Sequence, residues 1–158
     1  MQKKQTKQRH VRSQQLQKEP SYITTIDYGP TPFSVDIEAA TITNENYRTT
    51  LWTGDNIQLT LMTIEVGDDI GLEVHPNNDQ FLRIEQGFGQ VQMGPSEDNL
   101  NYKQQVYDGF AVFVPAGTWH NIINMGNIKL KLYAIYGPSH HPHGTVHTTK
   151  EVAELEGD

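Results

Sequence analysis

Two short stretches of this chain carry side chains suited to metal chemistry. In the first, Glu73 and His75 stand two residues apart, so they point to the same face of an extended strand. In the second, His120 follows a turn that Pro115 and Gly117 predict, because proline ends a strand and glycine accepts positive φ. A histidine beside a rigid turn points in a fixed direction, as a metal ligand must. The same ring could instead bond only to a backbone carbonyl, and these residues alone leave both interpretations open.

Gln80 is a further interior candidate. Residues 76–78, Pro-Asn-Asn, predict a turn. Beyond it, Gln80 shares its strand face with two aliphatic residues, Leu82 and Ile84. Asp79 has the opposite phase, and placing it inside would also bury Arg83 and Glu85 at a large desolvation cost. We therefore expect Gln80 to face the interior and Asp79 to cap the turn.

The elements that would position these residues are strands. Short apolar or alternating segments separated by Gly and Pro turns predict an all-β sandwich or barrel. Residues 110–114 are five consecutive apolar residues, typical of a strand buried on both faces. A phase change between residues 57–61 and 62–66 suggests a bulge. We also expect a short edge strand at residues 33–37 and a helix only at residues 149–156.

The spacing of these residues resembles the paired motifs of the cupin superfamily. The second motif, from Gly109 to Asn124, matches at every marked position. The first, from Gly67 to Gly87, matches in spacing and in both glycines, but has Glu73 where cupins usually have His and Gln80 where they usually have Glu. The chain also resembles small bacterial single-domain cupins likened to the cupin part of mannose-6-phosphate isomerases. The resemblance implies a single jelly-roll β-barrel.

The resemblance also implies a metal site formed by Glu73, His75, Gln80 and His120. Two histidines and one carboxylate suit non-haem iron(II) and catalytic zinc, while manganese and nickel remain open. Gln80 is a neutral, weak ligand that lowers the affinity, and Glu73 supplies the missing negative charge. We therefore expect a divalent metal ion. The alternative is a cupin that has lost its metal and kept a polar pocket.

The reaction is not specified by these residues. A metal-dependent isomerase or dioxygenase is possible, with Glu73, Tyr107 or Tyr136 as candidate catalytic acids or bases. The expected substrate pocket is lined by Leu82, Ile84, Trp119 and Tyr136. A sugar-phosphate isomerase is one alternative, although few basic residues are available to bind a phosphate. A non-catalytic barrel that binds a small ligand is the other.

Composition supports one domain in a chain of 158 residues with no cysteine and a net charge of −7. We expect a polar, basic and disordered arm at residues 1–20, the barrel at residues 21–148, and a short acidic tail at residues 149–158. No secretory leader or membrane span is evident, so a cytoplasmic protein is expected. The acidic body makes nucleic-acid binding unlikely.

Two further expectations concern surfaces. Cupins often pair through their outer strands, and Phe33 and Phe81 are candidates for the seam of a homodimer. Four histidines lie close together near the C-terminus: His140, His141, His143 and His147. Such a run could bind a second metal. Pro138 and Pro142 make the segment extended, however, which favours packing over the mouth of the barrel.

Overall fold

The computed structural model describes residues 26–157, and this part of the chain is mostly β. It contains nine strands and two short helices. In chain order these are α1 (Ile37–Thr43), β1 (Arg48–Thr53), β2 (Gln58–Ile64), β3 (Asp79–Gln86), β4 (Phe88–Gly94), β5 (Tyr102–Tyr107), β6 (Ala111–Val114), β7 (Trp119–Asn124), β8 (Leu130–Gly137), β9 (Val146–His147) and α2 (Lys150–Leu155).

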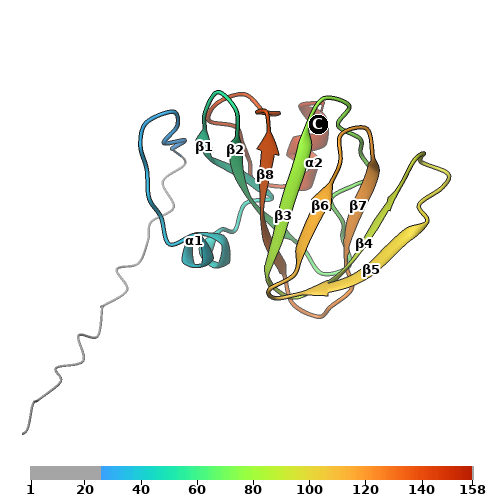
Figure 1. Cartoon of the computed structure of the whole chain (residues 1–158). Helices are drawn as coiled ribbons and strands as arrows, with labels where there is room; N and C mark the ends of the chain where they lie inside the picture. Colours follow the sequence, from blue (N-terminus) through green and yellow to red (C-terminus); the bar gives the residue numbers. More distant parts are fainter. Residues whose placement is uncertain (1–25, 158) are drawn as a thin grey trace, which may run out of the picture.

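The strands form two antiparallel sheets that face each other (Figure 1). The larger sheet has the order β6-β3-β8-β2-β1-β9, and the smaller has the order β5-β4-β7. One buried cluster lies between them, with Leu82 and Ile84 from β3, Leu132 from β8, and Val91 and Ile122 from the smaller sheet. This is the jelly-roll β-barrel that the sequence predicted.

The outer face of the larger sheet is covered by the segment that precedes β1. Leu61 and Tyr133 on this face form a second apolar cluster with Phe33 and Ile37. The edge strand expected at residues 33–37 is wrong, because helix α1 begins at Ile37 with Asp36 as its N-cap. The bulge expected in β2 is also wrong. β2 and β8 pair without a register shift, and the register shift between β1 and β2 lies on β1, between Thr50 and Trp52. Both faces of β2 are buried, so apolar residues occur in both phases.

The strand expected at residues 110–114 is buried on one face only. Val112 and Val114 on β6 point into the barrel, whereas the side chain of Phe113 is 69% exposed. The apolar cluster on the outer face of the larger sheet does not include Phe113, so this face of β6 stays exposed. Five consecutive apolar residues therefore did not indicate double-sided burial here.

The predicted C-terminal helix is present as α2, and it is packed against the barrel. Thr149 is its N-cap, and Ala153 belongs to the main core cluster, at 2% exposure. Figure 1 shows α2 at the same end of the barrel as the last residues of β8. The basic arm expected at residues 1–20 lies outside the described residues.

Candidate metal centre

Three of the predicted ligands meet at one end of the barrel. Glu73 Oε1 lies 3.2 Å from His75 Nε2 and 3.3 Å from His120 Nε2. Glu73 and His75 lie in the connection between β2 and β3, and His120 lies on β7. The backbone N–H of each of Glu73 and His120 donates to the other's carbonyl, at 3.0 and 2.9 Å. This isolated bridge replaces the strand expected at residues 73–75 and fixes the two ligands side by side.

The turn before β7 sets the orientation of His120. Gly117 has the predicted positive φ, +78°, and its N–H donates to the carbonyl of His75 at 2.9 Å. His120 Nδ1 lies 2.9 Å from the carbonyl of Thr118, so it carries the proton and donates it. Its Nε2 faces Glu73 and His75 and is the ring atom that a metal ion could bind. The His120 ring therefore bonds to a backbone carbonyl, one of the two interpretations that the sequence left open. It still presents Nε2 as a ligand atom.

Three of the predicted ligands carry buried nitrogen or oxygen atoms that fit a metal ion. His75 Nε2, His120 Nε2 and Gln80 Oε1 are buried, and none has a hydrogen-bond partner among the described residues. Buried polar atoms are otherwise almost always satisfied. Gln80 is 3% exposed at the start of β3 and faces inward, as predicted. Asp79 faces outward and accepts a hydrogen bond from the Ala116 N–H at 2.9 Å.

Glu73 is ionised at neutral pH. Burial alone would raise the pKa of this carboxyl, but its contacts with His120 and His75 outweigh the burial and hold the pKa well below its usual range. The site therefore offers one carboxylate and two imidazole nitrogens. Ligand atoms of all three residues lie within 4.8 Å of one another, a donor set that a single divalent ion can accept.

Comparison with known proteins places this site in a family. The Cupin domain model matches residues 60–136, which contain all four predicted ligands. The chain is 63% identical over 132 residues to the uncharacterized protein YrkC of Bacillus subtilis, covering 84% of this chain and 71% of YrkC. This chain belongs to the cupin superfamily. It departs from the usual motif at two ligand positions, Glu73 and Gln80.

Two further relatives of this cupin cover most of its described residues. The crystal structure of BH2720 from Bacillus halodurans is 58% identical with a TM-score of 0.82, covering 82% of this chain and 98% of that chain. The uncharacterized protein L612 of Acanthamoeba polyphaga mimivirus is 40% identical, covering 72% of this chain and 70% of L612. Within the described residues, neither helix is long and apolar enough to cross a membrane.

The sequence favoured packing of the segment after β8 over the mouth of the barrel, but it did not identify His140 as a neighbour of His75. The His140 ring lies 4.1 Å from the His75 ring, and the Tyr136 ring meets His75 edge-on at 5.6 Å. Gln58 on β2 holds the segment: its Oε1 accepts from the N–H groups of His140 and His141 at 3.0 and 2.9 Å. Its Nε2 donates to the His141 carbonyl at 2.7 Å. No fixed spacing links Gln58 to residues more than 80 positions away, so a motif could not reveal it.

The four histidines of this segment make different contacts. His143 Nε2 lies 2.7 Å from the Gly29 carbonyl. His147 Nδ1 lies 3.0 Å from Arg48 Nη1, and its Nε2 lies 2.8 Å from Glu156 Oε2. Burial, together with the charges of Arg48 and His140, lowers the pKa of His141 to about 2. Among the described residues, no second cluster suited to a metal ion includes these histidines.

The remaining predicted site residues lie in different surroundings. Leu82 and Ile84 are fully buried in the core, and Trp119 is half-buried at the start of β7. Tyr136 is buried beside His75. Tyr107 is 53% exposed on β5, and its ring packs against Phe110 at 4.5 Å. Of the two candidate catalytic tyrosines, Tyr136 is therefore the one that contacts a cluster residue.

Proposed function

We propose that this cupin holds a divalent metal ion with Glu73, His75 and His120, and uses it to bind or transform a small polar molecule. The convergence of Glu73 Oε1 with the two Nε2 atoms, at 3.2 and 3.3 Å, carries the proposal. Iron(II), zinc, manganese and nickel all accept this donor set. Gln80 Oε1 would be a weak fourth ligand.

The protein's own residues prepare the site in two ways. The lowered pKa of Glu73 keeps one negative charge in place, so metal binding does not compete with a proton on this carboxyl near neutral pH. The Thr118 carbonyl holds the His120 ring through Nδ1, so Nε2 faces the other two ligands. A bound divalent ion would supply Lewis-acid polarisation of a ligand oxygen.

A sugar-phosphate isomerase is less well supported, because the basic residues are engaged elsewhere. Arg48 is buried and bonds to His147, and Lys103 lies exposed on β5. Lys131 is buried on the outer face of the larger sheet, where its Nζ donates to the carbonyls of Ile42 and Asn44 at 2.6 and 2.7 Å. None of these contacts leaves a cation prepared for a phosphate.

A non-catalytic ligand-binding cupin would use the same metal ligands without turnover. Metal titration of the purified protein and of His120→Ala tests the metal site, which the catalytic and the non-catalytic proposals share. We expect one divalent ion per chain in the parent and at least a hundredfold weaker affinity in the variant, since one of three strong ligands is lost. His143→Ala is the matched control, because His143 bonds to Gly29 outside the cluster. Equal affinity in the parent and His120→Ala would reject the ligand assignment.

A homodimer in the cytoplasm is part of the same proposal. Phe33, one of the two proposed seam residues, stacks on Tyr28 at 4.4 Å within its own chain. Phe81 packs against Phe113, whose ring is 69% exposed. The face around Phe113 is therefore the better candidate for the seam. Light scattering of the parent and of Phe113→Ser would test it, with a fall from dimer to monomer expected in the variant.

A further inference from the structure

Strand β5 has one edge that no other strand of the described residues pairs with. It is the edge strand of the smaller sheet and pairs with β4 in a continuous register. Figure 1 shows β5 at the outer end of that sheet, away from α1. Most of its side chains are exposed, including Tyr102 at 51% and Tyr107 at 53%. Natural edge strands usually carry charges, prolines or bulges that discourage pairing, whereas β5 has a single charge, Lys103. The free edge of β5 is therefore open to another strand.

The register of β4 shows which backbone groups of β5 face this free edge. Phe88 on β4 lies opposite Tyr107, and its carbonyl accepts from the Met125 N–H, on the side of β7, at 2.9 Å. Opposite residues of an antiparallel pair direct their backbone groups either toward each other or both away. Tyr107 therefore directs its backbone groups to the free edge. Because this direction alternates along a strand, Gln105 and Lys103 direct their N–H and carbonyl groups to the same edge.

One antiparallel register suits two copies of β5 best. Opposite residues must lie on the same face of the joined sheet, so a twofold axis near the middle of the strand passes through Gln104 or Gln105. An axis at Gln105 would use the Tyr107 carbonyl, which already accepts from the Phe110 N–H at 2.9 Å. An axis at Gln104 places Lys103 of each copy opposite Gln105 of the other, and these two residues can exchange hydrogen bonds. In that register Lys103 does not face its own copy, so no like charges meet.

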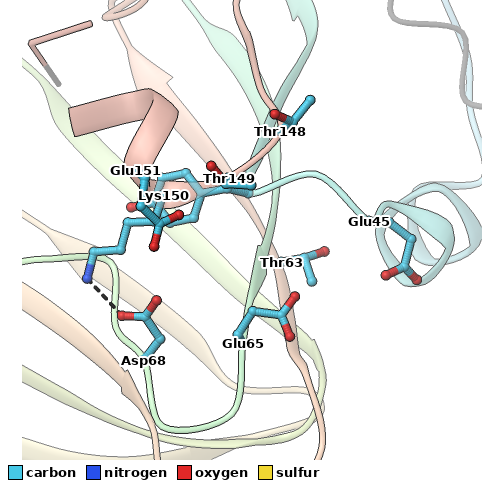
Figure 2. A pocket seen from close by; sticks show the side chains of 9 residues that line it. Glu45, Thr63, Glu65, Asp68, Thr148, Thr149, Lys150 and Glu151 are labelled. Atoms are coloured by element: carbon cyan, nitrogen blue, oxygen red, sulfur yellow. Dashed lines mark hydrogen bonds and ion pairs between the residues drawn. The ribbon is translucent and has the colours of Figure 1, made fainter. Parts of the chain in front are cut away.

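The surface beside β5 also favours a second copy. A groove between β5 and β6 has no charged residue among the described residues that line it, which include Val91, Met93, Tyr102, Gln104, Val106 and Phe113. The groove beside α2 is different, because Lys150 bonds to Asp68 within it (Figure 2). Its lining also includes the carboxylates of Glu45, Glu65 and Glu151. Charged residues are depleted from the core of protein interfaces, so the groove beside β5 is the better suited of the two.

We propose that two copies of this chain pair through β5, antiparallel, about a twofold axis at Gln104. The smaller sheets of the two copies would then join into one continuous sheet. Tyr102 of one copy would lie opposite Val106 of the other, on the face that lines the groove, and such aromatic and β-branched pairs stabilise a sheet. Phe113 lines the same groove, so this pairing adjoins the Phe113 face. The inference rests on the proposed homodimer and specifies the strand that joins it.

Cysteine crosslinking of the full chain tests the register, because the chain has no cysteine of its own. In Gln104→Cys the two thiols would face each other across the axis, at a separation that a disulfide can bridge. Gln105→Cys is the matched control, because Gln105 is also exposed and is the next residue of the strand. Its two thiols would be diagonal neighbours about 7–8 Å apart, beyond the reach of a disulfide. Mild oxidation should link Gln104→Cys into dimers at least about tenfold more completely than Gln105→Cys.

A proline substitution tests the backbone hydrogen bonds. Gln105→Pro removes an N–H from the free edge, a position at which edge strands tolerate proline. Gln105→Ala is the matched control, because it shortens the same side chain and keeps the N–H. Light scattering over a concentration series measures the Kd of the dimer. We expect this Kd to rise at least about tenfold in Gln105→Pro and to stay within about twofold in Gln105→Ala, because each dimer loses two N–H donors only in the proline variant.

The outcomes separate the β5 pairing from the homodimer itself. A dimer that Gln104→Cys links and Gln105→Pro weakens supports the pairing. A dimer that Gln104→Cys fails to link, that Gln105→Cys links equally well, or that Gln105→Pro leaves unchanged overturns the pairing and leaves the homodimer standing. A parent chain that is monomeric at every concentration overturns the homodimer and the pairing together. The metal site is judged independently, because neither substituted residue belongs to the cluster of Glu73, His75 and His120.

Discussion

His141 makes the stability of this protein sensitive to mild acid. Its side chain is buried, and that burial, with the charges of Arg48 and His140, lowers its pKa from 6.5 to about 2. In the unfolded chain the ring titrates near 6.5. Below that pH the unfolded state binds a proton that the folded state does not, so the free energy of unfolding falls as the pH falls.

The magnitude follows from the two pKa values. Between pH 7 and pH 5, this one group lowers the free energy of unfolding by about 2 kcal/mol, close to 1.4 kcal/mol per pH unit once the unfolded ring is protonated. His141→Gln removes the titration. The difference in stability between pH 7 and pH 5 should therefore be about 2 kcal/mol smaller in the variant than in the parent.

Urea unfolding at several pH values measures this difference. A chelator should be present throughout, so that proton competition for a metal does not enter. His143→Gln is the control, because the His143 side chain is 54% exposed. If the parent and His141→Gln lost equal stability between pH 7 and pH 5, the ring would not be held neutral by burial, and the reasoning would be refuted.

Two further substitutions test the mouth of the barrel. Gln80→Glu should tighten divalent metal binding about tenfold or more by adding an anionic ligand. It should also lower the melting temperature of the metal-free protein, because the new carboxylate would be buried at a position that is 3% exposed. A chelator-competition titration would detect the tighter binding, and unchanged affinity would show that Gln80 does not coordinate. Gln58→Leu should lower the free energy of unfolding by about 2–4 kcal/mol, because it leaves backbone groups of His140 and His141 without their hydrogen-bond partner. A loss below about 0.5 kcal/mol would mean that Gln58 does not anchor this segment.

The sequence was most informative where a local pattern has one geometric solution. Glu73 and His75 had to share a face, and the turn at Gly117 had to orient His120. Both features are seen in the structure. Gln80 faces inward as predicted, but one part of that argument was wrong: Glu85, which it placed outside, is buried at 5% exposure and forms an ion pair with Arg83.

The sequence was least informative where a long-range contact decides the outcome. Helix α1 replaces an expected strand because its apolar side chains pack on the outer face of the larger sheet. The same segment buries the outer face of β2, so apolar residues occur in both phases of this strand. From the sequence alone, that pattern could not be distinguished from a bulge. The contacts of His140 with His75 and Gln58 depend on where the segment after β8 returns to the barrel, and no local spacing encodes that return.

The most direct test of the metal site is elemental mass spectrometry of the full chain, purified without an affinity tag and reconstituted in turn with iron(II), manganese, zinc and nickel. We predict close to one divalent ion per chain for the parent and for His143→Ala, and little or none for His120→Ala. No metal in the parent after any reconstitution, or one ion per chain in His120→Ala, would contradict the assignment of Glu73, His75 and His120 as ligands.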